Sequence, residues 1–148
     1  MSSFSLSRRQ ALLAAPVMLA APAIAQAQPR AIKLGIIQPV TGALAQDGEY
    51  GRLGAELAIA DINAGGGIKA LGGAPIEMVF GDARSTPDGG VAEVEKMQAE
   101  GVLAIVGGFA SPICLAASQA ASRYDLPYIV DVGVSDQIVS RGLTNTFR

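Results

Sequence analysis

Short apolar runs alternate with longer amphipathic runs along the chain from Arg30 onward. The apolar runs are rich in β-branched residues and predict strands over 32–38, 76–80, 103–106 and 128–130, with the start of a fifth strand over 144–148. Between them, apolar side chains recur at helical spacing and predict helices over about 50–63, 87–100 and 112–123. This alternation is typical of a sheet covered by helices, so the sequence predicts an α/β fold, a doubly wound parallel sheet in one domain or lobe.

Two of the predicted helices begin at a hydroxyl residue followed by proline. Thr86 precedes Pro87 and Asp88, and these residue types are preferred at the N-cap, the first helical position and the first turn. Ser111 precedes Pro112 in the same way. The sequence therefore predicts that Thr86 and Ser111 stand as caps at the two helix starts.

The first 27 residues have the order of an export signal. Two arginines, Arg8 and Arg9, are followed by an apolar run over 11–24 and then by Ala25-Gln26-Ala27. The apolar run is fourteen residues long and contains two prolines, whereas a transmembrane helix needs about 20 apolar residues. We therefore expect 1–27 to be a signal peptide that is removed. The arginine pair fits the twin-arginine route and also the general secretory route.

Composition and charge exclude several classes of function. Eleven basic and thirteen acidic residues give a net charge of −2 with no block of like charge, so neither a nucleic acid nor a membrane surface is an expected partner. The chain contains no histidine, which rules out Ser-His-Asp catalysis, Cys-His catalysis and histidine-bearing zinc sites within it. Cys114 is the single cysteine and lies in an apolar stretch, so we expect a buried hydrophobe. No motif indicates a cofactor or a metal.

The loops after the predicted strands are the candidate site. In open α/β sheets, ligands bind beyond the carboxyl ends of the strands. The loop 107–111 combines two glycines, which allow close approach of the backbone, with Ser111 at a helix start, where a carboxylate would fit. A serine at this place can also merely cap its own helix. Asp82 and Asp131 follow other strands, where capping a turn is the commoner role.

Three runs of the chain carry a resemblance to a known family. The run Gly-Ile-Ile-Gln-Pro-Val-Thr-Gly over 35–42, the run over 54–68 that ends in Asn-Ala-Gly-Gly-Gly-Ile, and Val-Gly-Gly-Phe-Ala-Ser over 106–111 resemble the branched-chain amino acid (Leu/Ile/Val)-binding family of exported ABC-importer receptors. The resemblance implies the type I periplasmic-binding-protein fold, in which two α/β lobes hinge around one ligand. It also implies that residues 28–148 are the N-terminal part of the first lobe, truncated before the second lobe.

The same resemblance implies ligand-binding positions on two loops, which are Phe109, Ala110, Ser111, Val132, Val134 and Ser135. In amino-acid-binding members a serine after the third strand holds the ligand carboxylate, and Ser111 stands at that place. The loop after the fourth strand there reads small-x-Thr, with a backbone carbonyl for the ammonium and the Thr hydroxyl for the carboxylate. Here the loop reads Val132-Gly133-Val134 with Ser135 one position later, which leaves the backbone contact possible and removes the hydroxyl.

Together these patterns predict a periplasmic solute receptor of an ABC importer and not an enzyme. Its expected partners are a small amino acid-like, carboxylate or amide solute and the permease subunits, without direct insertion into the membrane once the signal is removed. A ligand-sensing lobe of a periplasmic signalling receptor would share every residue discussed and stays an alternative. An exported α/β hydrolase is the second alternative, although Gly-x-Ser-x-Gly and histidine are both missing from the chain.

Overall fold

Strands and helices alternate through the part of the chain that the structure describes. The computed structural model describes residues 29–148, so the predicted signal peptide lies outside the described residues. The elements are β1 (Ile32–Gln38), α2 (Ala45–Ala64), η1 (Lys69–Leu71), β2 (Ile76–Asp82), α3 (Pro87–Glu100), β3 (Ala104–Gly107), α4 (Ser111–Ser122), β4 (Tyr128–Ile129), α5 (Gln137–Ser140) and β5 (Thr146–Phe147).

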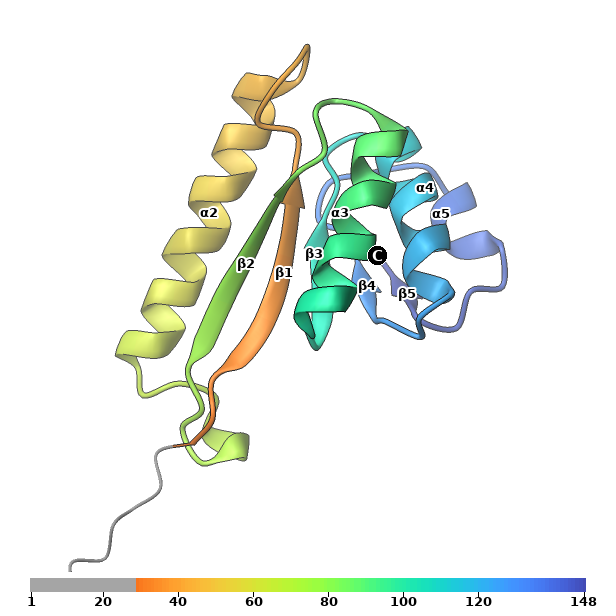
Figure 1. The fold of residues 1–148 in the computed structure, drawn as a ribbon. Coiled ribbons are helices and arrows are strands. Elements are labelled where there is room, and N and C mark those ends of the chain that lie inside the picture. The colour runs from red at the N-terminus through yellow and green to blue at the C-terminus, as the bar shows by residue number, and fades with distance from the viewer. Residues whose placement is uncertain (1–28) are drawn as a thin grey trace, which may run out of the picture.

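The five strands form one parallel sheet in the order β2-β1-β3-β4-β5. The chain passes from β1 to β2 on one side, returns across β1 to β3, and then continues outward on the other side (Figure 1). The winding direction therefore reverses beside β1 and β3, which makes their carboxyl ends the switch point where α/β sheets bind ligands. The predicted α/β fold with a doubly wound parallel sheet is confirmed.

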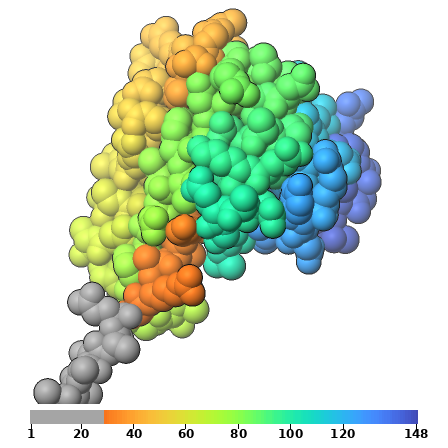
Figure 2. All heavy atoms as spheres, viewed as in Figure 1, coloured from red at the N-terminus to blue at the C-terminus, as the bar shows by residue number. Residues whose placement is uncertain are grey.

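Helices cover the two faces of the sheet unequally. On one face α2 packs against β1 and β2, whereas α3 and α4 pack against each other on the opposite face (Figure 1). In the space-filling view the green of α3 and the blue of α4 meet on the surface (Figure 2). The core lies on this second face because the apolar sides of two helices and of the inner strands meet there.

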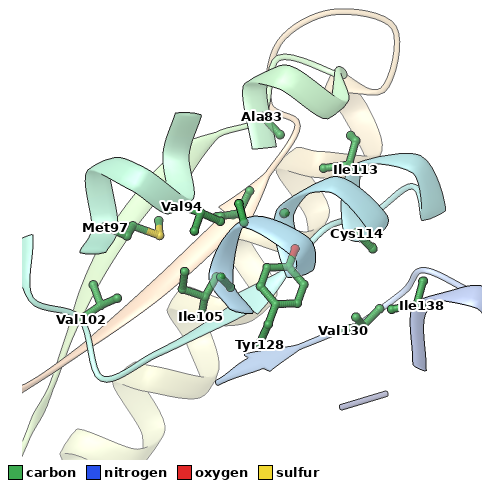
Figure 3. Packing of buried hydrophobic residues seen from close by; sticks show 14 of the residues in the cluster. Ala83, Val94, Met97, Val102, Ile105, Ile113, Cys114, Tyr128, Val130 and Ile138 are labelled. Atoms are coloured by element: carbon green, nitrogen blue, oxygen red, sulfur yellow. The ribbon is translucent and has the colours of Figure 1, made fainter. Parts of the chain in front are cut away.

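The largest side chains of that core come from the central strands and from α3, α4 and α5. Its fully buried members include Met97, Val94, Ile105, Ile113, Tyr128 and Ile138. The ring of Tyr128 extends from β4 toward α4 (Figure 3), and its hydroxyl donates to the carbonyl oxygen of Gly107 at 3.3 Å. The end of β3 is thereby tied to β4 through a buried side chain.

Apolar side chains remain exposed on the opposite face of β4 and β5. Ile129 is 42% exposed and Phe147 is 54% exposed, and these two residues are partners in the parallel register. Partners in neighbouring strands point to the same face. This face therefore carries an apolar surface over β4 and β5 within the described residues.

The start of α2 differs from the prediction. The sequence predicts this helix from about residue 50, whereas it begins at Ala45. Glycine weakens helix propensity by about 1 kcal/mol relative to alanine, and three glycines lie in the first ten residues of α2. Gly48 is buried because the helix lies close to β1 here: a Cβ added at Gly48 would lie 2.1 Å from the carbonyl oxygen of Pro39. Close packing against the end of β1 thus favours helix where propensity disfavours it.

Candidate functional site

The carboxyl ends of β1, β3 and β4 bring three loops together at one edge of the sheet. The loop after β3 begins with Gly107 and Gly108, whose φ angles are +136° and +86°. A Cβ at Gly107 would lie 2.1 Å from the carbonyl oxygen of Ile37, and one at Gly108 would lie 2.7 Å from the sulfur of Cys114. Only glycine fits these conformations and distances, so the paired glycines allow the backbone to turn tightly into α4.

Ser111 joins the loop after β3 to the loop after β4. Its Oγ accepts hydrogen bonds from the backbone N–H groups of Val134 and Ser135, both at 3.2 Å. The prediction that Ser111 caps its own helix is wrong: the N-cap of α4 is Ala110, which makes no side-chain cap hydrogen bond, and Ser111 is the first helical residue. Two N–H groups of the neighbouring loop occupy the hydroxyl instead. In contrast, the cap at Thr86 is confirmed, since its Oγ1 accepts from the N–H of Gly89 at 3.0 Å.

The structure places the six predicted positions on these two adjoining loops. Ser111, Val134 and Ser135 are in direct contact through the bonds just described. Phe109 and Ala110 are half-buried, and Ala110 packs against the core. Val132 is exposed and Val134 is 81% exposed. The two loops therefore present backbone groups, one hydroxyl and apolar side chains on the same edge.

Asp82 organises the turn beside this edge. Its carboxylate accepts hydrogen bonds from the N–H of Val40, the hydroxyl of Thr41 and the N–H of Arg84, at 3.0, 2.6 and 2.8 Å. Partial burial acts to raise the pKa of Asp82, but these hydrogen bonds to the charged form outweigh it and lower the pKa below its usual value. Asp82 thus caps the turns after β1 and β2.

Gln38 and Asp131 form a contact that sequence reasoning missed. The amide Nε2 of Gln38, at the end of β1, donates to Asp131 Oδ2 at 2.5 Å, although the residues are 93 positions apart. Asp131 follows β4, and its Oδ1 accepts from the N–H of Val132 at 2.8 Å. Because β3 lies between β1 and β4, this contact spans the switch point. Both residues stand at strand ends, which is the only signal the sequence carried.

The negative charge of Asp131 affects the pKa of two buried groups beneath this edge of the sheet. Cys114 is buried, and burial, with a smaller contribution from the charge of Asp131, raises the pKa of its thiol to about 12. Burial also holds the pKa of Tyr128 well above its usual value, with Cys114 and Asp131 adding to the effect. Both groups are therefore neutral at physiological pH.

Several hollows mark the surface of the described residues. A cavity of about 330 Å³ is lined by Asp131, Val132, Gly133, Val134 and Arg148. A larger one of about 550 Å³ lies at the amino ends of the strands, among residues that include Ile32, Lys33 and Glu77. The smaller cavity is the candidate site because it lies at the carboxyl ends of the strands.

Two further observations concern the described residues alone. Across residues 29–148 no three His, Cys, Asp or Glu side chains gather as metal ligands would. Of the helices within that range, none combines the length and the apolar character that crossing a membrane requires.

The fold and this edge define one class of protein, the solute-binding α/β lobes that hold a ligand at the carboxyl ends of parallel strands. Comparison with known families agrees. The family model described as "Periplasmic binding protein" matches residues 31–147, and the chain belongs to this family.

Individual relatives point the same way. The chain is 36% identical over 137 residues to Leu/Ile/Val-binding protein homolog 7 of Brucella melitensis. The matched region covers 92% of this chain and 33% of the relative. It is 35% identical over 117 residues to homolog 8 of Brucella abortus, covering 79% of this chain and 28% of that relative. The chain therefore spans about a third of the length of the curated relatives it matches.

Solved structures with this fold carry different solutes. The substrate-binding protein LivJ of Streptococcus pneumoniae, solved with isoleucine, is 31% identical with a TM-score of 0.73, over 80% of this chain and 33% of that chain. A solute-binding protein of Rhodopseudomonas palustris, solved with 3,4-dihydroxybenzoic acid, has a TM-score of 0.66 over 79% of this chain and 32% of that chain. At 24% identity the second likeness shows the fold alone.

Proposed function

We propose that this chain forms one wall of the solute site of an extracytoplasmic receptor that serves an ABC importer. The solute is a small amino acid-like, carboxylate or amide compound, held across the loops after β3 and β4. The observation that carries the proposal is the hydroxyl of Ser111, which lies at the switch point and contacts both loops.

The hydrogen bonds of Ser111 leave its proton available. Two backbone N–H groups occupy the oxygen as an acceptor, and among residues 29–148 the hydroxyl donates no bond to a protein acceptor. A serine hydroxyl carries one proton for donation. The first turn of α4 adds free N–H groups and the positive end of a helix dipole. This combination favours a carboxylate or another strong acceptor on the solute.

The site is proposed to bind its solute and not to transform it. Within the described residues the contacts of Ser111 Oγ are backbone N–H groups, so no general base activates it as a nucleophile. Binding also fits the family to which the chain belongs.

A second lobe is proposed to supply the other wall, because the matched relatives are about three times as long as the matched part. Closure of two lobes around the solute would create contacts that the open form lacks, and these contacts would report occupancy to the permease subunits. Location in the periplasm follows from the export signal predicted over 1–27, and N-terminal sequencing of the exported protein tests its removal.

Calorimetric titration of the full-length protein tests the proposal. We expect one of a panel of L-amino acids, amino acid amides and aromatic acids to bind, and Ser111→Ala to weaken that binding by about 5- to 150-fold, the effect of losing one hydrogen bond to a charged group. Ser122→Ala, at the other end of α4, is the matched control and leaves affinity unchanged. Absence of binding across the panel would overturn the proposed function. Unchanged affinity in Ser111→Ala would limit this residue to holding the two loops together.

A further inference from the structure

Gln38 is a buried polar side chain with a single hydrogen bond. It is 1% exposed, its Nε2 binds Asp131, and its Oε1 is buried without a partner among the described residues. The packing makes room for it: a Cβ at Gly51 of α2 would lie 2.7 Å from the amide carbon of Gln38. Burying a half-satisfied amide is unfavourable for folding. What the amide does at this position is to fix the carboxylate of Asp131.

Asp131 presents an uncompensated negative charge at the edge of the sheet. The residue is exposed, and none of the ion pairs formed within residues 29–148 includes it. Its two hydrogen bonds, from Gln38 and from the N–H of Val132, leave further lone pairs, because a carboxylate has about four acceptor positions. A donor on a solute can therefore reach a carboxylate that is already oriented.

The cavity beside Asp131 has a second charge, which is paired with another residue. Arg148 lines the same cavity, but its guanidinium donates to the carbonyl oxygen of Val134 at 2.6 Å and to Asp136 at 2.9 Å. The guanidinium is therefore paired with Asp136 and not with Asp131. Val132 and Val134, on the loop after β4, line the same cavity.

We propose that Asp131, positioned by Gln38, selects a solute that carries a positively charged nitrogen and disfavours one that carries only a carboxylate. The inference rests on the proposed function, since it concerns the same solute site. A cationic nitrogen gains a charge-assisted hydrogen bond at Asp131, whereas a purely anionic solute meets like charge there. Ser111 remains the donor for an acceptor group on the same solute.

Matched solutes test this selection in the full-length protein. L-Isoleucine and 3-methylpentanoate share a carbon skeleton and a carboxylate and differ in the ammonium group, as do L-phenylalanine and 3-phenylpropanoate. Titration of the wild type should show at least about tenfold tighter binding of the amino acid in the pair that binds, the scale of one hydrogen bond between charged groups. Asp131→Asn keeps the shape and removes the charge, and we expect it to reduce that ratio by about tenfold.

Two further variants complete the design. Gln38→Met removes the hydrogen bond to Asp131 at similar volume and should lower the ratio by a smaller factor, as a positioning residue does. Asp61→Asn removes the same charge from an exposed position near the end of α2 and should leave the ratio unchanged. Thermal unfolding of each variant shows that it is folded.

The outcomes separate the inference from the proposed function. If the wild type binds none of the four compounds and none of the wider panel, the proposed function fails. If it binds 3-methylpentanoate or 3-phenylpropanoate as tightly as the matched amino acid, the inference is overturned and the receptor function stands. A ratio unchanged in folded Asp131→Asn also overturns the inference, and a ratio unchanged in folded Gln38→Met removes Gln38 from it.

Discussion

Thr86-Pro87 and Ser111-Pro112 are similar dipeptides at the starts of α3 and α4, yet their hydroxyls have different partners. Thr86 accepts from Gly89, three residues ahead, whereas Ser111 accepts from residues 23 and 24 positions away. Sequence spacing identifies local partners, so the first role was predictable. The second depends on how the loop after β4 folds back onto α4, which local spacing does not show.

The cap at Thr86 gives a prediction for stability. Thr86→Ala removes the acceptor for the N–H of Gly89, and the free energy of unfolding should fall by about 1 kcal/mol. This loss corresponds to a decrease in Tm of about 4 °C for a domain of this size. Thr86→Ser keeps the acceptor and should stay close to wild type in thermal unfolding. Equal melting temperatures for all three proteins would contradict the cap.

The hydrogen bonds of Asp82 predict how stability depends on pH. Its pKa is lowered in the folded protein, so the unfolded chain binds the proton more readily, and stability falls as the pH decreases below the usual carboxyl range. The contribution is fully present above the unfolded pKa and is lost as the pH falls through the lowered folded value. Denaturant unfolding between about pH 6 and pH 3 should show a shallower loss for Asp82→Asn than for the wild type. Asp61→Asn is the charge control and should follow the wild type.

At the scale of elements, every strand and helix that periodicity predicted is present, whereas η1 and α5 were not predicted. Boundaries differ where tertiary packing decides. β1 has the predicted bounds, whereas α2 begins about five residues early. Glycines that lower helix propensity are what allow α2 to approach the end of β1. Helix propensity alone therefore disfavours a helix at the same glycines that close packing requires.

Two glycines of α2 should respond oppositely to alanine. At Gly54 an added Cβ meets nothing within 4 Å, so Gly54→Ala should raise the free energy of unfolding by up to about 1 kcal/mol through helix propensity. At Gly48 the same methyl would lie 2.1 Å from the carbonyl oxygen of Pro39. Gly48→Ala should therefore destabilise the protein despite its better propensity. Denaturant unfolding measures both, and stabilisation by Gly48→Ala would contradict the close approach of α2.

At the scale of the whole molecule, the sheet order brings together residues that no local pattern connects. The α/β class and the edge that carries the site follow from alternation and from the strand ends. The contact between Gln38 and Asp131 follows only from the placement of β3 between β1 and β4. Its two partners are far apart in the chain, and capping a turn is an ordinary local role for Asp131.

The apolar face over β4 and β5 predicts association of residues 29–148 when they are produced alone. Ile129 and Phe147 are both exposed there, and exposed apolar surface on a sheet favours contact between molecules. Replacing both by threonine keeps β propensity and should lower the mass measured by light scattering at a given concentration. Leu57→Gln, at an exposed position of α2, is the control. If the control alone restores a monomer, the contact lies on α2.

Cys114 is buried beneath both loops of the site, because a Cβ at Gly108 or at Gly133 would lie within 2.7 Å of its sulfur. Thiol reagents attack the thiolate, and with a pKa of about 12 this thiol is unreactive while buried. Reaction near neutral pH therefore requires the two loops to separate, so the rate of thiol labelling measures how often the sheet edge opens. We expect a bound solute to lower the labelling rate of Cys114. In denaturant the labelling rate should equal that of a free cysteine. Slower labelling of Cys114 in the presence of a solute would therefore report binding at this edge of the sheet.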